Sequence, residues 1–138
     1  MANGDFVRYF GTPLSRTWNR VLFLTWGLFA VAMGFLAVAS QRTGKRLWWV
    51  DAHGIQLFFT IALIYFSAVL VIGLAIKQSR FALSVAILVG IAHIVSACFD
   101  LSETTGSAVP AFVLAISTLA ASLACTAGIG QRPSTRTQ

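Results

Sequence analysis

The side chains that could do chemistry in this sequence are few, and they fall near the ends of long apolar runs. They include both histidines and three of the four acidic residues. We call the following residues the polar cluster: Asp51, His53, Gln56, His93, Ser96, Asp100 and Glu103. His93 stands out because it lies well inside an apolar run, where ionisable side chains are costly and commonly functional.

Helical spacing aligns the polar side chains in two stripes. His93, Ser96 and Asp100 are three and four residues apart, which places them on one face of a helix. A second stripe, on the preceding apolar run, consists of His53, Gln56, Thr60 and Ser67. The segment Lys77–Arg80 that joins the two runs is so short that it predicts a tight antiparallel hairpin. The two stripes should therefore meet, with most of the polar cluster at one membrane surface.

Several chemistries fit this cluster poorly. Two haem ligands must lie at one depth, but His53 and His93 would be roughly 16 Å apart along their helices. A zinc site at the surface is chemically possible, yet no characteristic ligand spacing supports one. Ser96 can neighbour His93, but no glycine-rich turn for an oxyanion accompanies the pair. The sequence predicts no cofactor, no metal site, no catalytic residue and a protein that is not an enzyme.

The elements that must position these residues follow from composition. Of 138 residues, 57% are hydrophobic and only 10% are charged, whereas a soluble domain carries roughly 25% charged residues. The uncharged runs are long enough for about 20 apolar residues to cross a hydrocarbon core of ~30 Å as a helix. The fold class predicted is an all-α integral membrane protein, a bundle of four antiparallel transmembrane helices. The expected spans are about 21–39, 55–76, 81–99 and 109–129.

The net charge of +6 comes from basic residues at the ends of the spans, which indicates membrane topology and anionic lipid rather than a nucleic acid. Seven lie in the termini and the second loop: Arg8, Arg16, Arg20, Lys77, Arg80, Arg132 and Arg136. Three lie in the first loop: Arg42, Lys45 and Arg46. The positive-inside rule then predicts a plasma (inner) membrane protein with both termini cytoplasmic.

The chain divides into three parts. Residues 1–20 mix aromatic and basic side chains and predict a short amphipathic segment on the cytoplasmic face. Residues 21–130 form the transmembrane domain, and residues 131–138 a disordered cytoplasmic tail. Ala37-Val38-Ala39 before Ser40 also fits a signal-peptide cleavage pattern, although the apolar run is longer than is usual for one.

Two loops should lie on the outer side. The first ends in Trp48 and Trp49, and tryptophan favours the membrane interface, so we expect both rings there. The other spans residues 100–110, where Ser107 is placed to cap the fourth span and Pro110 is tolerated in its first turn.

Small residues indicate where helices approach closely. In the first span they are Gly27, Ala30, Gly34 and Ala37. In the fourth span they form two series, Ala120, Ala124 and Gly128, and Ser117, Ala121 and Cys125. One face of the fourth span can pack inside the bundle, and the other is free for a protein partner or a second copy.

Three functions remain open. The first is a non-catalytic accessory or interaction subunit that acts through its spans. The second is a small carrier or pore-forming oligomer, with a hydrated cavity along the polar stripe between the second and third spans. The third is an enzyme that acts on a lipid or quinone at the outer surface, which needs Asp51, His53 and Asp100 within hydrogen-bond reach of one another.

Overall fold

The computed structural model describes residues 14–44, 47–51, 53–103 and 105–129, and within them the chain is almost entirely helical, without a strand. The elements are α2 (Arg16–Thr43), α3 (Trp48–Asp51), α4 (Ile55–Ile76), α5 (Ala82–Glu103), α6 (Thr105–Ala124) and the 3-10 helix η1 (Cys125–Gly128). Most of the expected amphipathic segment and the whole expected tail lie outside the described residues.

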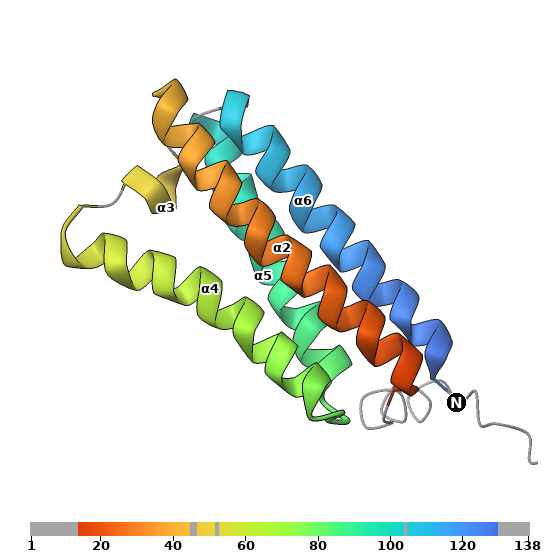
Figure 1. Cartoon of the computed structure of the whole chain (residues 1–138). Helices are drawn as coiled ribbons and strands as arrows, with labels where there is room; N and C mark the ends of the chain where they lie inside the picture. The colour runs from red at the N-terminus through yellow and green to blue at the C-terminus, as the bar shows by residue number, and fades with distance from the viewer. Residues whose placement is uncertain (1–13, 45–46, 52, 104, 130–138) are drawn as a thin grey trace, which may run out of the picture.

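Four helices, α2, α4, α5 and α6, are long and apolar enough to cross a membrane. They run alternately up and down as a bundle (Figure 1). Large apolar side chains such as Leu28, Phe35, Phe58 and Leu63 are exposed on the outside, as expected where the solvent is lipid. The prediction of an all-α membrane bundle is therefore confirmed.

α2 is longer than the span expected over 21–39, because the signals that start and stop it lie outside the apolar run. Ser15 caps its start by accepting a hydrogen bond from the Trp18 N–H at 3.5 Å. At its end Gly44 takes the left-handed conformation (φ 69°), and its N–H binds the Gln41 carbonyl. The helix thus extends beyond the apolar run at both ends.

The loop expected over residues 100–110 is almost absent. α5 continues to Glu103 and α6 already begins at Thr105. The predicted cap at Ser107 is therefore wrong, and Pro110 lies inside α6 rather than in its first turn. The apolar pattern marks where a helix enters lipid, but the helix itself ends only where its backbone hydrogen bonds end.

The helices do not pack equally. α5 and α6 contact each other along most of their length, and α2 packs against both α4 and α6. α4 diverges from the rest of the bundle toward its N-terminal end, where the short α3 lies beside it (Figure 1). The connection from α4 to α5 is short as predicted, but α4 makes its main contact with α2 because a turn fixes only the ends that it joins.

Small side chains explain the close packing of α5 on α6. Ala86 and Ala97 of α5 and Ala111 and Ala115 of α6 are all buried. A Cβ atom added at Gly90 would lie only 3.1 Å from Cδ1 of Leu119. Helix backbones can approach in lipid only where such small residues face each other.

The turn from α4 to α5 has a Schellman geometry. The Ser79 N–H binds the Leu74 carbonyl at 2.9 Å, and the Gln78 N–H binds the Ala75 carbonyl at 3.0 Å. Gln78 occupies the position that needs a left-handed backbone (φ 50°). Glycine is the usual residue there, because any side chain is strained in that conformation.

Candidate functional site

Near the middle of the bundle, polar and aromatic side chains from all four long helices meet. Nε2 of His93 on α5 lies 3.0 Å from Oγ of Ser67 on α4. His93 is 11 residues above the start of α5, so the pair lies about 16 Å along that helix. We call this group the central layer; it consists of Trp26, Phe29, Ser67, His93 and Ser122.

The hydrogen bonds of Ser67 assign the proton on the His93 ring. Ser67 Oγ is only 2.6 Å from the Ile64 carbonyl, which takes the single hydroxyl proton. In the neutral imidazole Nε2 must therefore carry the proton and donate it to Ser67. Nδ1 is then an acceptor, and it has no partner among the described residues.

α2 and α6 complete the central layer. The Phe29 ring lies 4.7 Å from the His93 ring between centroids, and the Trp26 ring lies 6.2 Å from it. The Trp26 indole N–H donates to Ser122 Oγ at 3.3 Å, and the Ser122 hydroxyl donates to the Thr118 carbonyl at 2.8 Å. Trp26 and Phe29 are buried, so His93 is held by packing on one side and a hydrogen bond on the other.

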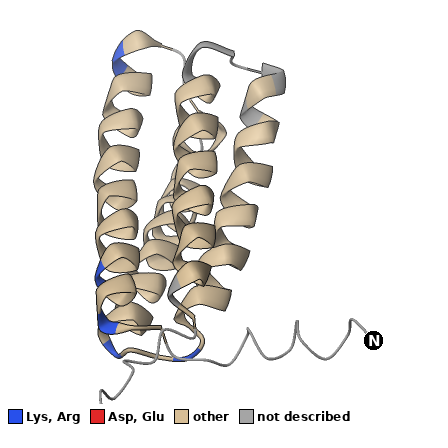
Figure 2. Ribbon diagram, turned by 90° about the vertical axis from the view of Figure 1, so that its right-hand side faces the viewer, with Lys and Arg blue, Asp and Glu red and all other residues tan. Residues whose placement is uncertain are grey.

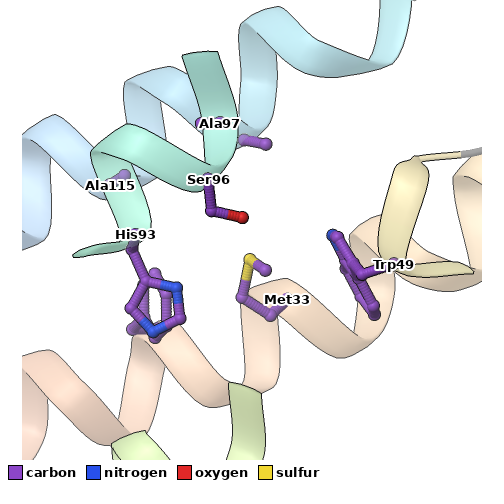
Figure 3. Close-up of a pocket in the computed structure, with 8 residues that line it drawn as sticks. Met33, Trp49, His93, Ser96, Ala97 and Ala115 are labelled. Carbon is purple, nitrogen blue, oxygen red and sulfur yellow. The ribbon is translucent and has the colours of Figure 1, made fainter. Parts of the chain in front are cut away.

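A cavity of about 10 Å³ adjoins His93, which is about the room that one water molecule needs. Figure 3 shows His93 and Ser96 of α5 facing Met33 of α2 and Trp49 of α3 across this space. Ser96 lines the cavity but is not bonded to His93; its Oγ accepts from the Trp48 indole N–H at 3.1 Å. The arrangement can hold a water beside the His93 ring, but it is too small for an organic substrate.

The second polar stripe, on α4, does not continue the central layer to the surface. The Thr60 hydroxyl lies 3.0 Å from the carbonyls of Trp49, Gln56 and Leu57 and so binds backbone oxygens. Gln56 and His53 are exposed at the diverging end of α4. The structure therefore brings Ser67 of this stripe to His93 and leaves His53 and Gln56 apart from it.

The rest of the polar cluster lies at the end of the bundle away from the α4–α5 turn. Asp51 is exposed at the end of α3. The side chains of Asp100 and Glu103 lie outside the described part of the chain, so their proximity to Asp51 stays a prediction. Within the described residues, no group of three or more His, Cys, Asp or Glu side chains could hold a metal ion.

The two tryptophans expected at the interface differ. Trp48 is 45% exposed and binds Ser96, whereas Trp49 is only 2% exposed. Trp49 therefore packs inside the bundle rather than against lipid headgroups, and its depth in the membrane stays a prediction. As neighbours in the helical turn α3, the two side chains point in different directions, and that of Trp49 points into the bundle.

Gly27 and Gly34, the predicted packing glycines of α2, differ in their surroundings. A Cβ atom at Gly34 would lie 2.9 Å from the Tyr65 hydroxyl oxygen, so the tip of the Tyr65 side chain of α4 occupies the space beside this glycine. A Cβ atom at Gly27 would meet nothing within 4 Å. Of these two glycines, only Gly34 packs against another helix within the described part of the chain.

The small residues of α6 separate into a buried and an exposed face. The buried face consists of Ala108, Ala111, Ala115, Thr118 and Ser122, and it continues into η1 with Cys125. Ala120 and Ala124 of the predicted series are exposed, and Gly128 ends η1. At 100° per residue, Ser117, Ala121 and Ala124 lie on one stripe of α6.

Ser117 of that stripe lines a groove between α2 and α6, which we call the α2/α6 groove. It has a volume of about 390 Å³. Its lining is apolar apart from three hydroxyls and consists of Thr25, Leu28, Phe29, Val31, Ala32, Phe35, Leu114, Ser117 and Thr118. Because these residues belong to the apolar spans, the groove opens to lipid.

Sequence reasoning missed three members of the central layer: Trp26, Phe29 and Ser122. A signal was present, because a tryptophan in the middle of an apolar span carries an N–H that needs an acceptor. The sequence did not show that this acceptor is Ser122, since their pairing depends on which helices are neighbours.

Comparison with protein-family models, with characterised proteins and with solved structures finds no match for this chain.

Proposed function

We propose that this protein is a non-catalytic subunit of a membrane protein assembly, and that a transmembrane helix of its partner binds in the α2/α6 groove. The observation that carries the proposal is the groove itself, with about 390 Å³ of space on the lipid-facing side of the bundle. Lipid can cover a surface of large side chains without a groove, whereas a second helix packs closely only where small residues leave room for its backbone.

The chemistry of the lining favours a helix as the occupant. Ala32 and Ser117 are small and let a backbone approach, while Leu28 and Phe35 form walls. The Ser117 hydroxyl donates to the Val113 carbonyl at 2.8 Å, so its oxygen can still accept a hydrogen bond from a neighbour. An apolar segment at this depth must satisfy its backbone internally, which a helix does.

The central layer supports a role without catalysis. The polar side chains that meet there bind one another or backbone carbonyls and join α2 to α6 and α4 to α5. Such bonds hold helices together in a bundle. We infer that His93 positions helices and thereby gives the α2/α6 groove a fixed shape.

Basic residues support a plasma (inner) membrane location with cytoplasmic termini. Figure 2 shows most of the Lys and Arg of the described residues at one end of the bundle and a smaller basic segment at the other. Arg16 and Arg20 begin α2, and Lys77 and Arg80 lie in the α4–α5 turn at the same end, whereas Arg42 lies at the other. We propose that the end with four basic residues faces the cytoplasm.

Photocrosslinking in native membranes tests the partner. A photoreactive amino acid at Ser117 should give one dominant adduct with another membrane protein, because Ser117 lines the groove. The same amino acid at Leu63, which is 66% exposed on α4, should label lipid and give no dominant protein adduct. Equal adducts at both positions would contradict the proposal.

A filled groove provides the matched control. Ala32→Phe should abolish co-purification of the partner in mild detergent, whereas Val69→Phe on the exposed face of α4 should not. If the dominant Ser117 adduct instead has twice the mass of this chain, the groove binds a second copy and the proposal of a different partner fails.

A further inference from the structure

A second groove, at the end of the bundle that carries the α4–α5 turn, has features of a site for a charged ligand. Its volume is about 440 Å³. It lies between the first turns of α2 and the end of α4, and it is lined by Arg16, Asn19, Arg20, Phe23, Ala75, Ile76 and Gln78. We call it the basic groove. It is separate from the α2/α6 groove and shares no residue with it.

Asn19 gives the strongest indication of a ligand. Only 4% of its surface is exposed, yet neither its amide nitrogen nor its amide oxygen has a hydrogen-bond partner among the described residues. A buried amide without partners costs about 1–3 kcal/mol. Asn19 lines the basic groove but both amide atoms are enclosed, so its side chain must turn toward the groove for a ligand there to accept from the NH₂ group and donate to the oxygen.

The charges around Asn19 select an anion. Arg16 is the first residue of α2 and Arg20 lies one turn later, and no acidic residue accompanies them in the first turn. The positive end of the helix dipole disfavours cations there and favours an anion. Two guanidinium groups beside an amide donor suit the oxygens of a phosphate group.

Gln78 contributes a strained position to the rim. Its left-handed backbone (φ 50°) costs about 1–2 kcal/mol for a residue with a side chain. Its side chain lines the groove. A glycine at this position would relieve the strain but would remove the polar side chain from the groove, which is consistent with a binding role.

The apolar wall of the groove identifies the rest of the ligand. Phe23 is 40% exposed and Ile76 is 66% exposed, and both belong to spans that face lipid. A ligand bound beside the arginines can therefore extend its apolar part along α2 and α4 into the bilayer. A free phosphate ion has no apolar part to pack against this wall, whereas a phospholipid has acyl chains.

We propose that the basic groove binds one anionic phospholipid whose headgroup carries a hydroxyl. Arg16 and Arg20 bind the phosphate, and the Asn19 NH₂ group donates to a phosphate oxygen. The headgroup hydroxyl donates to the Asn19 amide oxygen. The acyl chains lie against Phe23 and Ile76. This site does not depend on the partner proposed for the α2/α6 groove.

The purified full chain in detergent provides the test, with phosphatidylglycerol as the probe. Addition of this lipid should raise the thermal unfolding midpoint, and native mass spectrometry should show one retained lipid. Phosphatidylcholine, and glycerol 3-phosphate as the soluble form of the headgroup, should both fail to do so. An equal rise with phosphatidylcholine would contradict the proposed anionic headgroup. An equal rise with glycerol 3-phosphate would show that the groove binds the phosphate group without the acyl chains.

Two substitutions of equal charge separate the groove from the general basic surface. Arg20→Gln should weaken phosphatidylglycerol binding at least about tenfold, because a hydrogen bond to a charged group is lost. Arg80→Gln should change binding little, since Arg80 lies outside the groove with its guanidinium carbon 4.9 Å from the centre of the Phe81 ring. Equal effects of the two would overturn the proposal.

Asn19→Leu distinguishes a binding role from a structural one. In the absence of lipid this variant should unfold at a higher temperature than the wild type, because it removes two unpartnered polar atoms from a buried position. It should also lose the rise caused by phosphatidylglycerol. A variant that unfolds earlier but keeps the lipid-dependent rise would show that the amide serves the fold and not the ligand.

Discussion

The His93 imidazole and the Ser67 hydroxyl, 3.0 Å apart, form a polar bond between α5 and α4 near the middle of the bundle. These two helices are joined by a short turn at one end but diverge toward the other (Figure 1). The bond therefore joins the two helices at a distance from the turn that connects them.

Removal of one partner of this bond should destabilise the protein. Ser67→Ala leaves the His93 N–H without an acceptor in an apolar span, and we expect a loss of about 1–2 kcal/mol in unfolding free energy. Unfolding by a graded increase of dodecyl sulfate in mixed micelles, followed by tryptophan fluorescence, measures this loss.

The double variant Ser67→Ala with His93→Phe provides the control. It removes both partners and keeps a ring against Phe29, so it should be more stable than Ser67→Ala alone. If the loss of stability in the double variant equals the sum of the losses in Ser67→Ala and His93→Phe, the bond does not couple α4 to α5.

The two glycines of α2 should respond differently to the same substitution. Gly34→Ala places a Cβ atom 2.9 Å from the Tyr65 hydroxyl oxygen, so the Tyr65 ring must shift, which should offset the gain of roughly 1 kcal/mol from replacing a glycine in a helix. Gly27→Ala meets no atom within 4 Å and should be neutral or stabilising, because alanine is the better helix former. Thermal unfolding in detergent compares the two.

Tyr65→Phe checks the cause of the Gly34 effect. It removes the hydroxyl oxygen that the new Cβ atom meets, so Gly34→Ala should be better tolerated in this background. A cost at Gly34 that is unchanged by Tyr65→Phe would place the conflict elsewhere on α4.

Gln78→Gly should stabilise the lipid-free protein by about 1 kcal/mol, because glycine adopts the left-handed conformation (φ 50°) of this turn without strain. Ser79→Gly is the matched control, since Ser79 has no positive φ and should gain nothing. Both are measured as shifts in the thermal unfolding midpoint without added phospholipid. A loss of stability in Gln78→Gly would mean that its side chain, and not its backbone, decides the stability of the turn.

The number and course of the spans were predictable because the length of an apolar run is set by the thickness of the membrane. The ends of the helices were not, since α2 and α5 continue as helices past their apolar runs to Thr43 and Glu103. The lean of α4 was also not predictable. At its leaning end α4 packs against α3, a single helical turn whose four residues carry no periodic pattern.

For the site, the sequence predicted which residues share a helix face, but not which of them meet in the bundle. Spacing placed His93 and Ser67 on the polar stripes of neighbouring helices, and these two do meet. Spacing could not show that His53 remains exposed, because His53 and Ser67 belong to the same polar stripe and look equally suited to meet His93. Asn19 carried no signal at all, since an asparagine at the edge of a span is ordinary until its burial is known.

Membrane orientation gives the last prediction, because it decides which leaflet can reach the basic groove. Thr43→Cys at the end of α2 and Ser79→Cys in the α4–α5 turn report on opposite ends of the bundle. Both are made in a background without Cys98 and Cys125. A membrane-impermeant thiol reagent on intact cells should label position 43 and leave position 79 unlabelled until the membrane is permeabilised. Labelling of position 79 alone on intact cells would reverse the topology, and the phospholipid of the basic groove would then have to come from the outer leaflet.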